Sequence, residues 1–223
     1  MRLGRAIALA LARDGMDVAI GYHRSARPAR RVVEELEACG ARSAAVRADL
    51  RDPRAAHRLV RQAARALGGL DVLVNGAAVF VRTPLGRTTP AAYDAILDLN
   101  LRGAFFCAQA AAAVLHDGGH IVNVGDAGID RGWPGYIPYT MSKAGIVALT
   151  RGLAAALGPR RIAVNCVAPG AVLRPVGFSR ARWARLAPGG DRAAEVAEAV
   201  VFFARCPAYV TGQILRVDGG QHP

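Results

Sequence analysis

The sequence has 223 residues, of which 52% are hydrophobic and 21% are charged, a balance typical of one folded globular domain and not of a disordered chain. Its net charge of +12 comes from 29 basic residues that are spread along the chain, so no specific nucleic-acid-binding patch is predicted. No apolar run approaches the ~20 residues that a membrane-spanning helix needs, and no integral membrane protein is expected.

Short apolar segments rich in Val and Ile alternate with longer segments of helical period. The expected strands are 17–21, 43–47, 71–75, 120–124, 162–167 and 213–217. The expected helices are 2–13, 28–38, 53–67, 90–115, 136–157 and 193–205. Near-continuous apolar strands separated by helices predict a parallel sheet covered on both faces, which is a doubly wound α/β fold. Because the composition does not change along the chain, residues 1–223 are expected to form a single domain.

Two features bear on the compartment in which the protein works. The four cysteines are widely spaced and form no CxxC motif, so neither disulfides nor a metal site is predicted and a cytoplasmic location is expected. Residues 6–12 are apolar and follow Arg2 and Arg5, which is also the pattern of a short signal peptide. The strand expected at 17–21 favours the alternative, in which these residues form the first helix of the domain.

The loop after the strand 17–21 is the first candidate binding segment, because ligands of open parallel sheets bind beyond the carboxyl ends of the strands. This loop contains His23, Arg24 and Ser25, whose imidazole, guanidinium and hydroxyl groups suit a phosphate dianion. It has no carboxylate, which would bind a ribose 2′-hydroxyl and repel a 2′-phosphate. The loop therefore favours NADP as a ligand, and a solvated polar turn is the alternative.

Tyr139 and Lys143 form the most informative pair in the sequence. They lie four residues apart on the helix expected at 136–157, so their side chains share one face. The ammonium of Lys143 is expected to lower the pKa of the Tyr139 phenol and allow proton transfer near neutral pH. A surface pair without function is the alternative, but Lys143 is the single lysine in an arginine-rich chain, which favours the functional interpretation.

Two further loops follow expected strands. The small residues Asn75-Gly76-Ala77-Ala78 after the strand 71–75 allow backbone to approach a flat ligand, and Phe80 lies just beyond them. Phe80 taken alone is better explained as a core residue. Asp126 follows the strand 120–124 and precedes Tyr139 by thirteen residues, and taken alone it is an ordinary loop carboxylate.

Several motifs occur together along the chain. They are Asn75-Gly76-Ala77, Asn100, Tyr139-x-x-x-Lys143, Pro169-Gly170, and the C-terminal stretch from Thr211-Gly212-Gln213 to Asp218-Gly219-Gly220. In this combination the whole chain resembles the short-chain dehydrogenase/reductase family. The resemblance implies a Rossmann fold, a nicotinamide cofactor, a small-molecule substrate and a homotetramer.

The resemblance also implies roles for individual residues. Tyr139 would be the proton donor, Lys143 would bind the nicotinamide ribose, and Asn100 would support a proton relay through water. The expected cofactor-binding residues are Arg2, Leu3, Gly4, His23, Arg24, Ser25, Asp49, Leu50, Asn75, Gly76, Ala77, Tyr139, Lys143, Pro169 and Gly170.

Within that family the chain is most similar to the pteridine reductases. The matching segments are Arg2-Leu3-Gly4-Arg5 and residues 22–26 (Tyr-His-Arg-Ser-Ala), together with Phe80, where those enzymes stack the pterin. Carbonyl-reducing members have a serine where this chain has Asp126. The resemblance implies NADPH-dependent reduction of pterins or dihydrofolate, with Phe80, Asp126 and Tyr139 in contact with the substrate. A short-chain carbonyl or 3-oxoacyl reductase is the alternative.

The sequence departs from the family in three places. The family begins with a strand and a glycine-rich turn, whereas this chain begins within that turn, so its Rossmann sheet is expected to lack the first strand. Because unpaired strand edges are costly, a degenerate non-catalytic member is a further alternative. Gly76 replaces a second asparagine, and the Arg- and Pro-rich segment at about 170–192 lies where the family has its mobile substrate loop.

Overall fold

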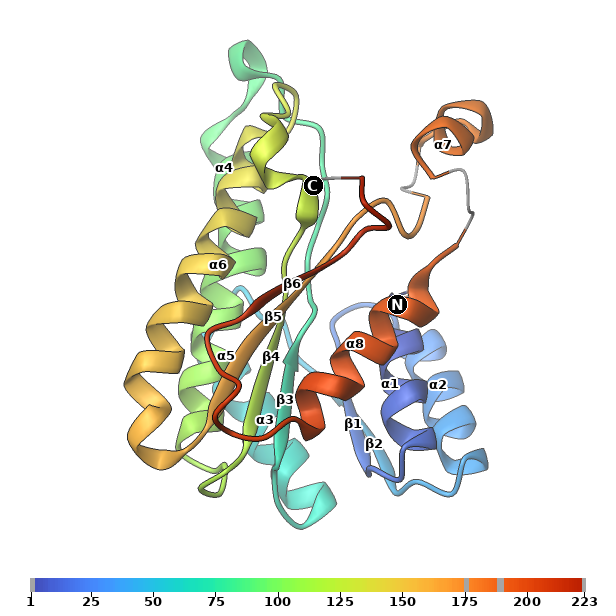
Figure 1. Ribbon diagram of the computed structural model, residues 1–223. Coiled ribbons are helices and arrows are strands. Elements are labelled where there is room, and N and C mark those ends of the chain that lie inside the picture. The colour runs from blue at the N-terminus through green and yellow to red at the C-terminus, as the bar shows by residue number, and fades with distance from the viewer. Residues whose placement is uncertain (1–2, 175–176, 188–190, 222–223) are drawn as a thin grey trace.

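Parallel strands form the centre of the computed structural model, which describes residues 3–174, 177–187 and 191–221 (Figure 1). The strands are β1 (Val18–Tyr22), β2 (Ser43–Arg47), β3 (Val72–Asn75), β4 (His120–Val124), β5 (Ala163–Pro169) and β6 (Ile214–Val217). Every strand pair is parallel. Each strand predicted from the sequence is present, and its ends differ from the prediction by no more than two residues. The doubly wound α/β fold is confirmed.

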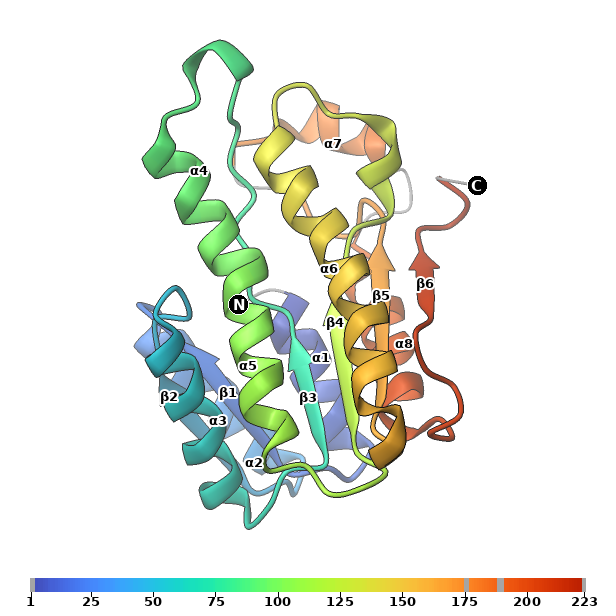
Figure 2. The ribbon, with the colours of Figure 1, turned by 90° about the vertical axis from the view of Figure 1, so that its left-hand side faces the viewer.

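Helices cover both faces of the strands (Figures 1 and 2). Their bounds are α1 (Leu3–Arg13), α2 (Ala26–Ala38), α3 (Pro53–Leu67), α4 (Pro90–Leu97), α5 (Gly103–Ala112), α6 (Ile137–Leu157), α7 (Arg180–Leu186) and α8 (Ala193–Arg205). One core cluster combines apolar residues of α1, α2 and α8 with β1 and β3, and a second combines α3 and α5 with β3 to β5. No helix among the described residues is long and apolar enough to cross a membrane.

Local sequence explains where individual helices begin and end. Asp52 caps α3, because its carboxylate accepts a hydrogen bond from the Arg54 amide at 2.9 Å, and Pro53 occupies the first helical position. Gly68 ends the same helix with φ of 83°, a left-handed conformation that glycine adopts without strain. The helix expected at 90–115 is divided into α4 and α5 by a π-helical turn, Asp98–Arg102. Such turns are rare and often lie at functional sites.

The strands belong to two sheets. One has the order β1-β2 and the other has the order β3-β4-β5-β6. Among the described residues no strand pairs with β1 on the side away from β2, or with β3 on the side away from β4. This agrees with the prediction that the sheet lacks one strand. The two sheets are nevertheless joined by packing, because Ile20 of β1 and Val74 of β3 contact the same core cluster of α1 and α8.

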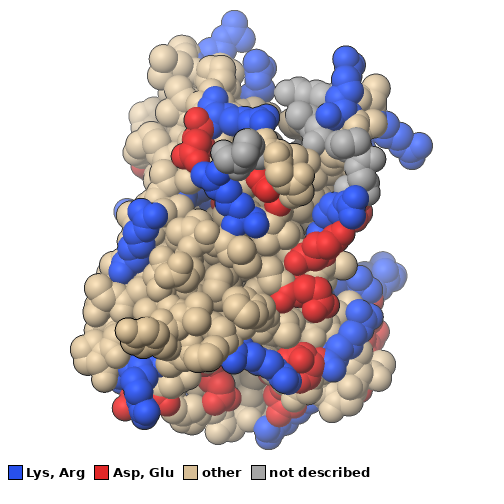
Figure 3. Space-filling model, viewed as in Figure 1, with Lys and Arg blue, Asp and Glu red and all other residues tan. Residues whose placement is uncertain are grey.

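Charged side chains are dispersed over the surface. On the face shown in Figure 3, arginines are scattered and interleaved with carboxylates, and they do not form one continuous patch. The exposed ion pairs include Arg42 with Asp17 and Arg160 with Asp117.

Candidate active site

A hydrogen bond between a phenol and a carboxylate lies at the carboxyl end of β4. Asp126 follows β4 and its Oδ1 accepts a hydrogen bond from the amide of Gly128 at 2.7 Å, which fixes the turn Ala127–Arg131. Tyr139 lies in the first turn of α6 and its hydroxyl donates to Asp126 Oδ2 at 2.6 Å. The Tyr139 side chain is buried, with 8% of its surface exposed. The structure thus brings together two residues that the sequence had singled out separately.

Lys143 lies one turn further along α6 and is also buried. Its Nζ donates a hydrogen bond to the carbonyl oxygen of Val124, the last residue of β4, at 2.8 Å. Burial lowers the pKa of Lys143, and the nearby charges of Asp126 and Cys166 act in the opposite direction. The single lysine of the chain is therefore an interior cation beside the Asp126 carboxylate, and it is not part of a surface pair.

The pKa of Tyr139 changes in the direction opposite to the sequence prediction. Burial raises the pKa well above its ordinary value, and the charge of Asp126 and the hydrogen bond to Asp126 raise it further. The expected lowering by Lys143 is wrong for this structure, because the carboxylate is bonded directly to the phenol whereas the ammonium is bonded to Val124. Tyr139 is therefore protonated at neutral pH in this structure, and its raised pKa makes it a weaker acid than an ordinary phenol.

Asn100 lies next to this group and connects three segments. It belongs to the π-helical turn, and its Oδ1 accepts a hydrogen bond from the Val79 amide at 2.8 Å. Its Nδ2 donates to the Val79 carbonyl at 3.1 Å and to Ser142 Oγ at 3.0 Å. Asn100 thereby holds the segment after β3 against α6. Both polar atoms of the side chain have protein partners, so in this structure the residue acts first as a structural link.

The side chain of Asn75, like that of Asn100, links separate segments through hydrogen bonds. Its Nδ2 donates to the Ala104 carbonyl at 3.2 Å and to Asn123 Oδ1 at 3.0 Å, which ties β3 to α5 and β4. Asn123 in turn donates to Thr150 of α6 at 2.9 Å. The following residues, Gly76 and Ala77, are exposed at the open end of β3. Their backbone, rather than the Asn75 amide, is available to a ligand.

The loop after β1 lies beside the loop after β2. His23 Nε2 is 3.7 Å from Asp49 Oδ2, so two of the segments predicted to bind the cofactor adjoin each other. Asp49 is bonded to Arg51, with Nη2 to Oδ2 at 2.6 Å, and this hydrogen bond is the main cause that lowers the pKa of Asp49 to about 2. Ser25 precedes α2, but its hydroxyl makes no capping hydrogen bond to the helix.

The remaining predicted cofactor ligands have diverse surroundings. Leu3 and Gly4 form the start of α1, whereas Arg2 lies outside the described residues. Leu50 packs against the core cluster of α3 and α5. Pro169 ends β5, and Gly170 follows it in close contact with the C-terminal segment. A Cβ atom on Gly170 would lie 2.6 Å from the Cβ of Asp218, so only glycine fits at this position.

An aromatic cluster borders the Tyr139 hydroxyl. Phe80 is stacked on Tyr136, with ring centroids 4.3 Å apart and an interplanar angle of 6°, and it meets Tyr139 edge-on at 4.7 Å. Trp133 contacts Phe80 edge-on at 5.6 Å. Phe80 is only partly buried, and these ring contacts place it beside Tyr139. The sequence prediction missed Trp133 and Tyr136, although the spacing of three between aromatic residues at 133, 136 and 139 was a usable signal.

Comparisons with known proteins agree with this arrangement. A family described as enoyl-(acyl carrier protein) reductase matches residues 2–222. The 3-oxoacyl-[acyl-carrier-protein] reductase FabG of Staphylococcus aureus is 34% identical, and the match covers 99% of this chain and 94% of that protein. A solved short-chain dehydrogenase/reductase of Serratia marcescens is 34% identical with a TM-score of 0.92, over 99% of this chain and 94% of that chain. The chain belongs to the short-chain dehydrogenase/reductase family.

Another similar solved structure contains a nicotinamide cofactor. A blue fluorescent protein from a metagenomic library, solved in complex with NADPH, is 39% identical with a TM-score of 0.91, over 98% of this chain and 92% of that chain. The resemblance to the family is thus confirmed over nearly the whole length. These relatives are not named as pteridine reductases, so they support the family and the reductase class without the pterin specificity.

Proposed function

We propose that this chain is an NADPH-dependent reductase that reduces the C=N bond of a pterin or dihydrofolate ring. One observation carries the proposal: the Tyr139 phenol donates a hydrogen bond to a carboxylate, Asp126, at 2.6 Å. Serine, which carbonyl-reducing members are expected to have at this position, donates a hydrogen bond to a C=O oxygen. An ionised carboxylate cannot donate, but it accepts hydrogen bonds from the N–H groups of a pterin.

The loop after β1 has the chemistry that a 2′-phosphate requires. Arg24 and Ser25 are exposed, and among the described residues neither side chain has a hydrogen bond or an ion pair. With His23 beside them, these residues fit NADPH, and we assign them to its 2′-phosphate. The other proposed ligands of the cofactor are Leu3, Gly4, Asp49, Leu50, Asn75, Gly76, Ala77, Tyr139, Lys143, Pro169 and Gly170. When bound, the cofactor supplies the hydride.

The protein residues then have separate tasks. Tyr139 is kept protonated by its raised pKa and delivers its proton to the ring nitrogen, which becomes strongly basic on reduction. Asp126 accepts an N–H group of the ring and orients it towards the phenol. Lys143 supplies the buried positive charge that offsets the phenolate left on Tyr139. Phe80, one face of which is covered by Tyr136, supplies its other face to a flat ring.

A 3-oxoacyl reductase is the second candidate, and the names of the relatives favour it. Two of them, from Staphylococcus aureus and Synechocystis, are both named 3-oxoacyl-[acyl-carrier-protein] reductase. In such a reaction Tyr139 would be the donor to the carbonyl oxygen. The Asp126 carboxylate would then repel the negative charge that develops on this oxygen, and this makes it the less suitable reaction for this site.

A panel of NADPH oxidation assays separates the candidates. With dihydrobiopterin, dihydrofolate and an acetoacetyl thioester as substrates, kcat/KM is expected to be at least about tenfold higher for a pterin or folate than for the thioester. The reverse preference would establish the oxoacyl reductase instead. A folded chain that fails to quench or enhance NADPH fluorescence on titration would identify a non-catalytic member.

We also propose that the chain assembles into a homotetramer. Exposed aromatic and large apolar side chains occur on two parts of the surface. Those on α4, α5 and α6 are Tyr93, Phe105 and Met141. Those on or near α8 and β6 are Phe202, Tyr209 and Leu215. Two separate apolar faces, each paired with itself by a two-fold axis, give a closed tetramer. Sedimentation velocity at micromolar concentration should give about four times the 23.4 kDa chain mass, and a monomer would contradict the proposal.

A further inference from the structure

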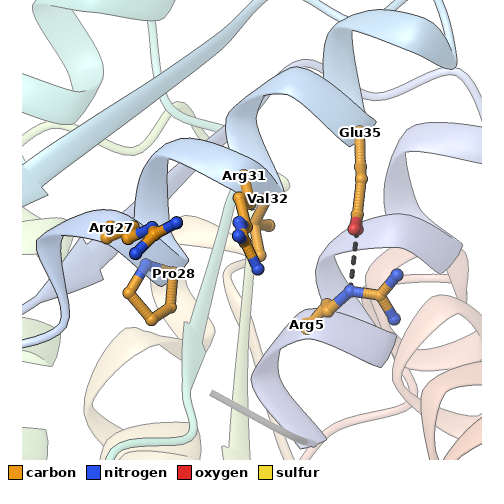
Figure 4. A pocket seen from close by; sticks show the side chains of 6 residues that line it. All are labelled: Arg5, Arg27, Pro28, Arg31, Val32 and Glu35. Carbon is orange, nitrogen blue, oxygen red and sulfur yellow. Dashed lines mark ion pairs between the residues drawn. The ribbon is translucent and has the colours of Figure 1, made fainter.

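A hollow of about 420 Å³ lies between α1 and α2 (Figure 4). Neither Asp126 nor Tyr139 lines it. Its lining residues are Arg5 of α1 and Arg27, Pro28, Arg31, Val32 and Glu35 of α2. Three of the six side chains are guanidinium groups and one is a carboxylate. The proposed function does not use this hollow.

The charges in the hollow are only partly balanced. Arg5 Nε lies 2.7 Å from Glu35 Oε2, and this ion pair closes one end, as Figure 4 shows. Arg27 and Arg31 have neither an ion pair nor a hydrogen bond with any other described residue. Two positive charges therefore face the hollow without a protein partner.

The charge order along α2 opposes the helix dipole. Arg27, Arg30 and Arg31 lie in its N-terminal half, and the first turn contains no acidic residue. Its carboxylates, Glu34, Glu35 and Glu37, all lie in the C-terminal half. Cations near the positive end of a helix are destabilising, and so are like charges four residues apart, such as Arg27 and Arg31. Both charge placements destabilise α2, and no contact among the described residues offsets them. Such an arrangement is better explained by a ligand that binds there than by a structural role.

We propose that this hollow binds a phosphate-containing anion with two or more charges, held by Arg27 and Arg31 above the apolar side chains of Pro28 and Val32. Two guanidinium forks one helical turn apart, with Cβ atoms about 5–6 Å from each other, match the spacing of a diphosphate. The bound anion would also neutralise the N-terminal half of α2. The site is distinct from the 2′-phosphate loop, which consists of the residues before α2.

Isothermal titration with sodium pyrophosphate tests the proposal without relying on the enzymatic reaction. The titration compares the unmodified chain with an Arg27→Ala/Arg31→Ala variant and with an Arg30→Ala/Arg61→Ala variant, which also removes two positive charges but from exposed residues outside the hollow. The Arg27→Ala/Arg31→Ala variant should bind pyrophosphate at least about tenfold more weakly, whereas Arg30→Ala/Arg61→Ala should stay within about twofold. Far-UV circular dichroism verifies that both variants keep the fold.

Several outcomes would overturn the proposal. Absence of pyrophosphate binding to the unmodified chain would do so, and so would equal weakening by the two charge-matched variants, because the effect would then come from overall charge. A repeat titration in saturating NADPH should leave the pyrophosphate affinity within about twofold. Displacement of pyrophosphate by NADPH would make the hollow a part of the cofactor site. None of these results depends on whether the chain reduces pterins.

Discussion

Replacing Asp126 by serine should shift the preference of the enzyme from pterin rings towards carbonyl substrates. The variant loses the carboxylate that accepts the ring N–H groups and gains a hydroxyl that donates to a C=O oxygen. We expect kcat/KM for dihydropterin to fall about 100-fold or more, and kcat/KM for an acetoacetyl thioester to rise. Steady-state NADPH oxidation with both substrates measures the two changes.

The matched control for this substitution is Asp130→Asn. Asp130 lies in the same turn, but its carboxylate is exposed and paired with Arg216 at 2.7 Å. Its replacement should leave the substrate preference unchanged. Unaltered pterin turnover in Asp126→Ser would contradict the role proposed for Asp126.

The same substitution has a consequence for the pH profile. In the unmodified chain, the charge of Asp126 raises the pKa values of both Tyr139 and Lys143. Activity that needs both groups protonated is present at low pH and is lost as the pH rises through these pKa values. Because serine removes the negative charge, both pKa values fall, and the alkaline limb of the kcat/KM profile should move to lower pH.

Replacing Tyr139 by phenylalanine should abolish most of the turnover while leaving NADPH binding nearly intact. The variant keeps the ring that contacts Phe80 edge-on but lacks the hydroxyl that supplies the proton. We expect kcat/KM to fall by about 1,000-fold, within the range of general acid catalysis, and the NADPH dissociation constant to change less than about threefold. Fluorescence titration and steady-state kinetics on one preparation separate the two effects.

This variant also tests the hydrogen bond as a structural element. Without the phenol, Asp126 Oδ2 loses the hydrogen bond that it accepts from Tyr139, and the free energy of unfolding should fall by about 1–3 kcal/mol. Full activity of Tyr139→Phe would show that the proton comes from another group.

The architecture was largely predictable because buried parallel strands have a strong sequence pattern. Val and Ile runs such as 120–124 stand out between Ala- and Arg-rich helices, and the observed β4 has the predicted bounds. The π-helical turn at Asp98–Arg102 was not predictable, because no proline or glycine lies within it and the helix continues from Gly103, which directly follows it. The short helix α7 was missed within the segment expected to be the substrate loop, of which residues 175–176 and 188–190 lie outside the described residues.

The site was predictable in its members but not in its electrostatics. The spacing of Tyr139 and Lys143 on one helix is a local property, and the structure places both side chains in the interior. The pKa of Tyr139 depends instead on how close Asp126 approaches the phenol, which is set by the turn after β4. For the same reason the sequence could not show that Asn100 is bonded to Val79 and Ser142.

The division of the strands has a consequence for how a dinucleotide would be held. His23, Arg24 and Ser25 extend from the two-stranded sheet, whereas Asp126 follows a strand of the four-stranded sheet and is bonded to Tyr139. Among the described residues, no ladder of backbone hydrogen bonds crosses from one sheet to the other. The span between the loop after β1 and the Asp126–Tyr139 pair is thus fixed by helix packing, of α1 against α8 and of α3 against α5, so that loosening these helices would separate phosphate recognition from proton transfer while leaving each intact.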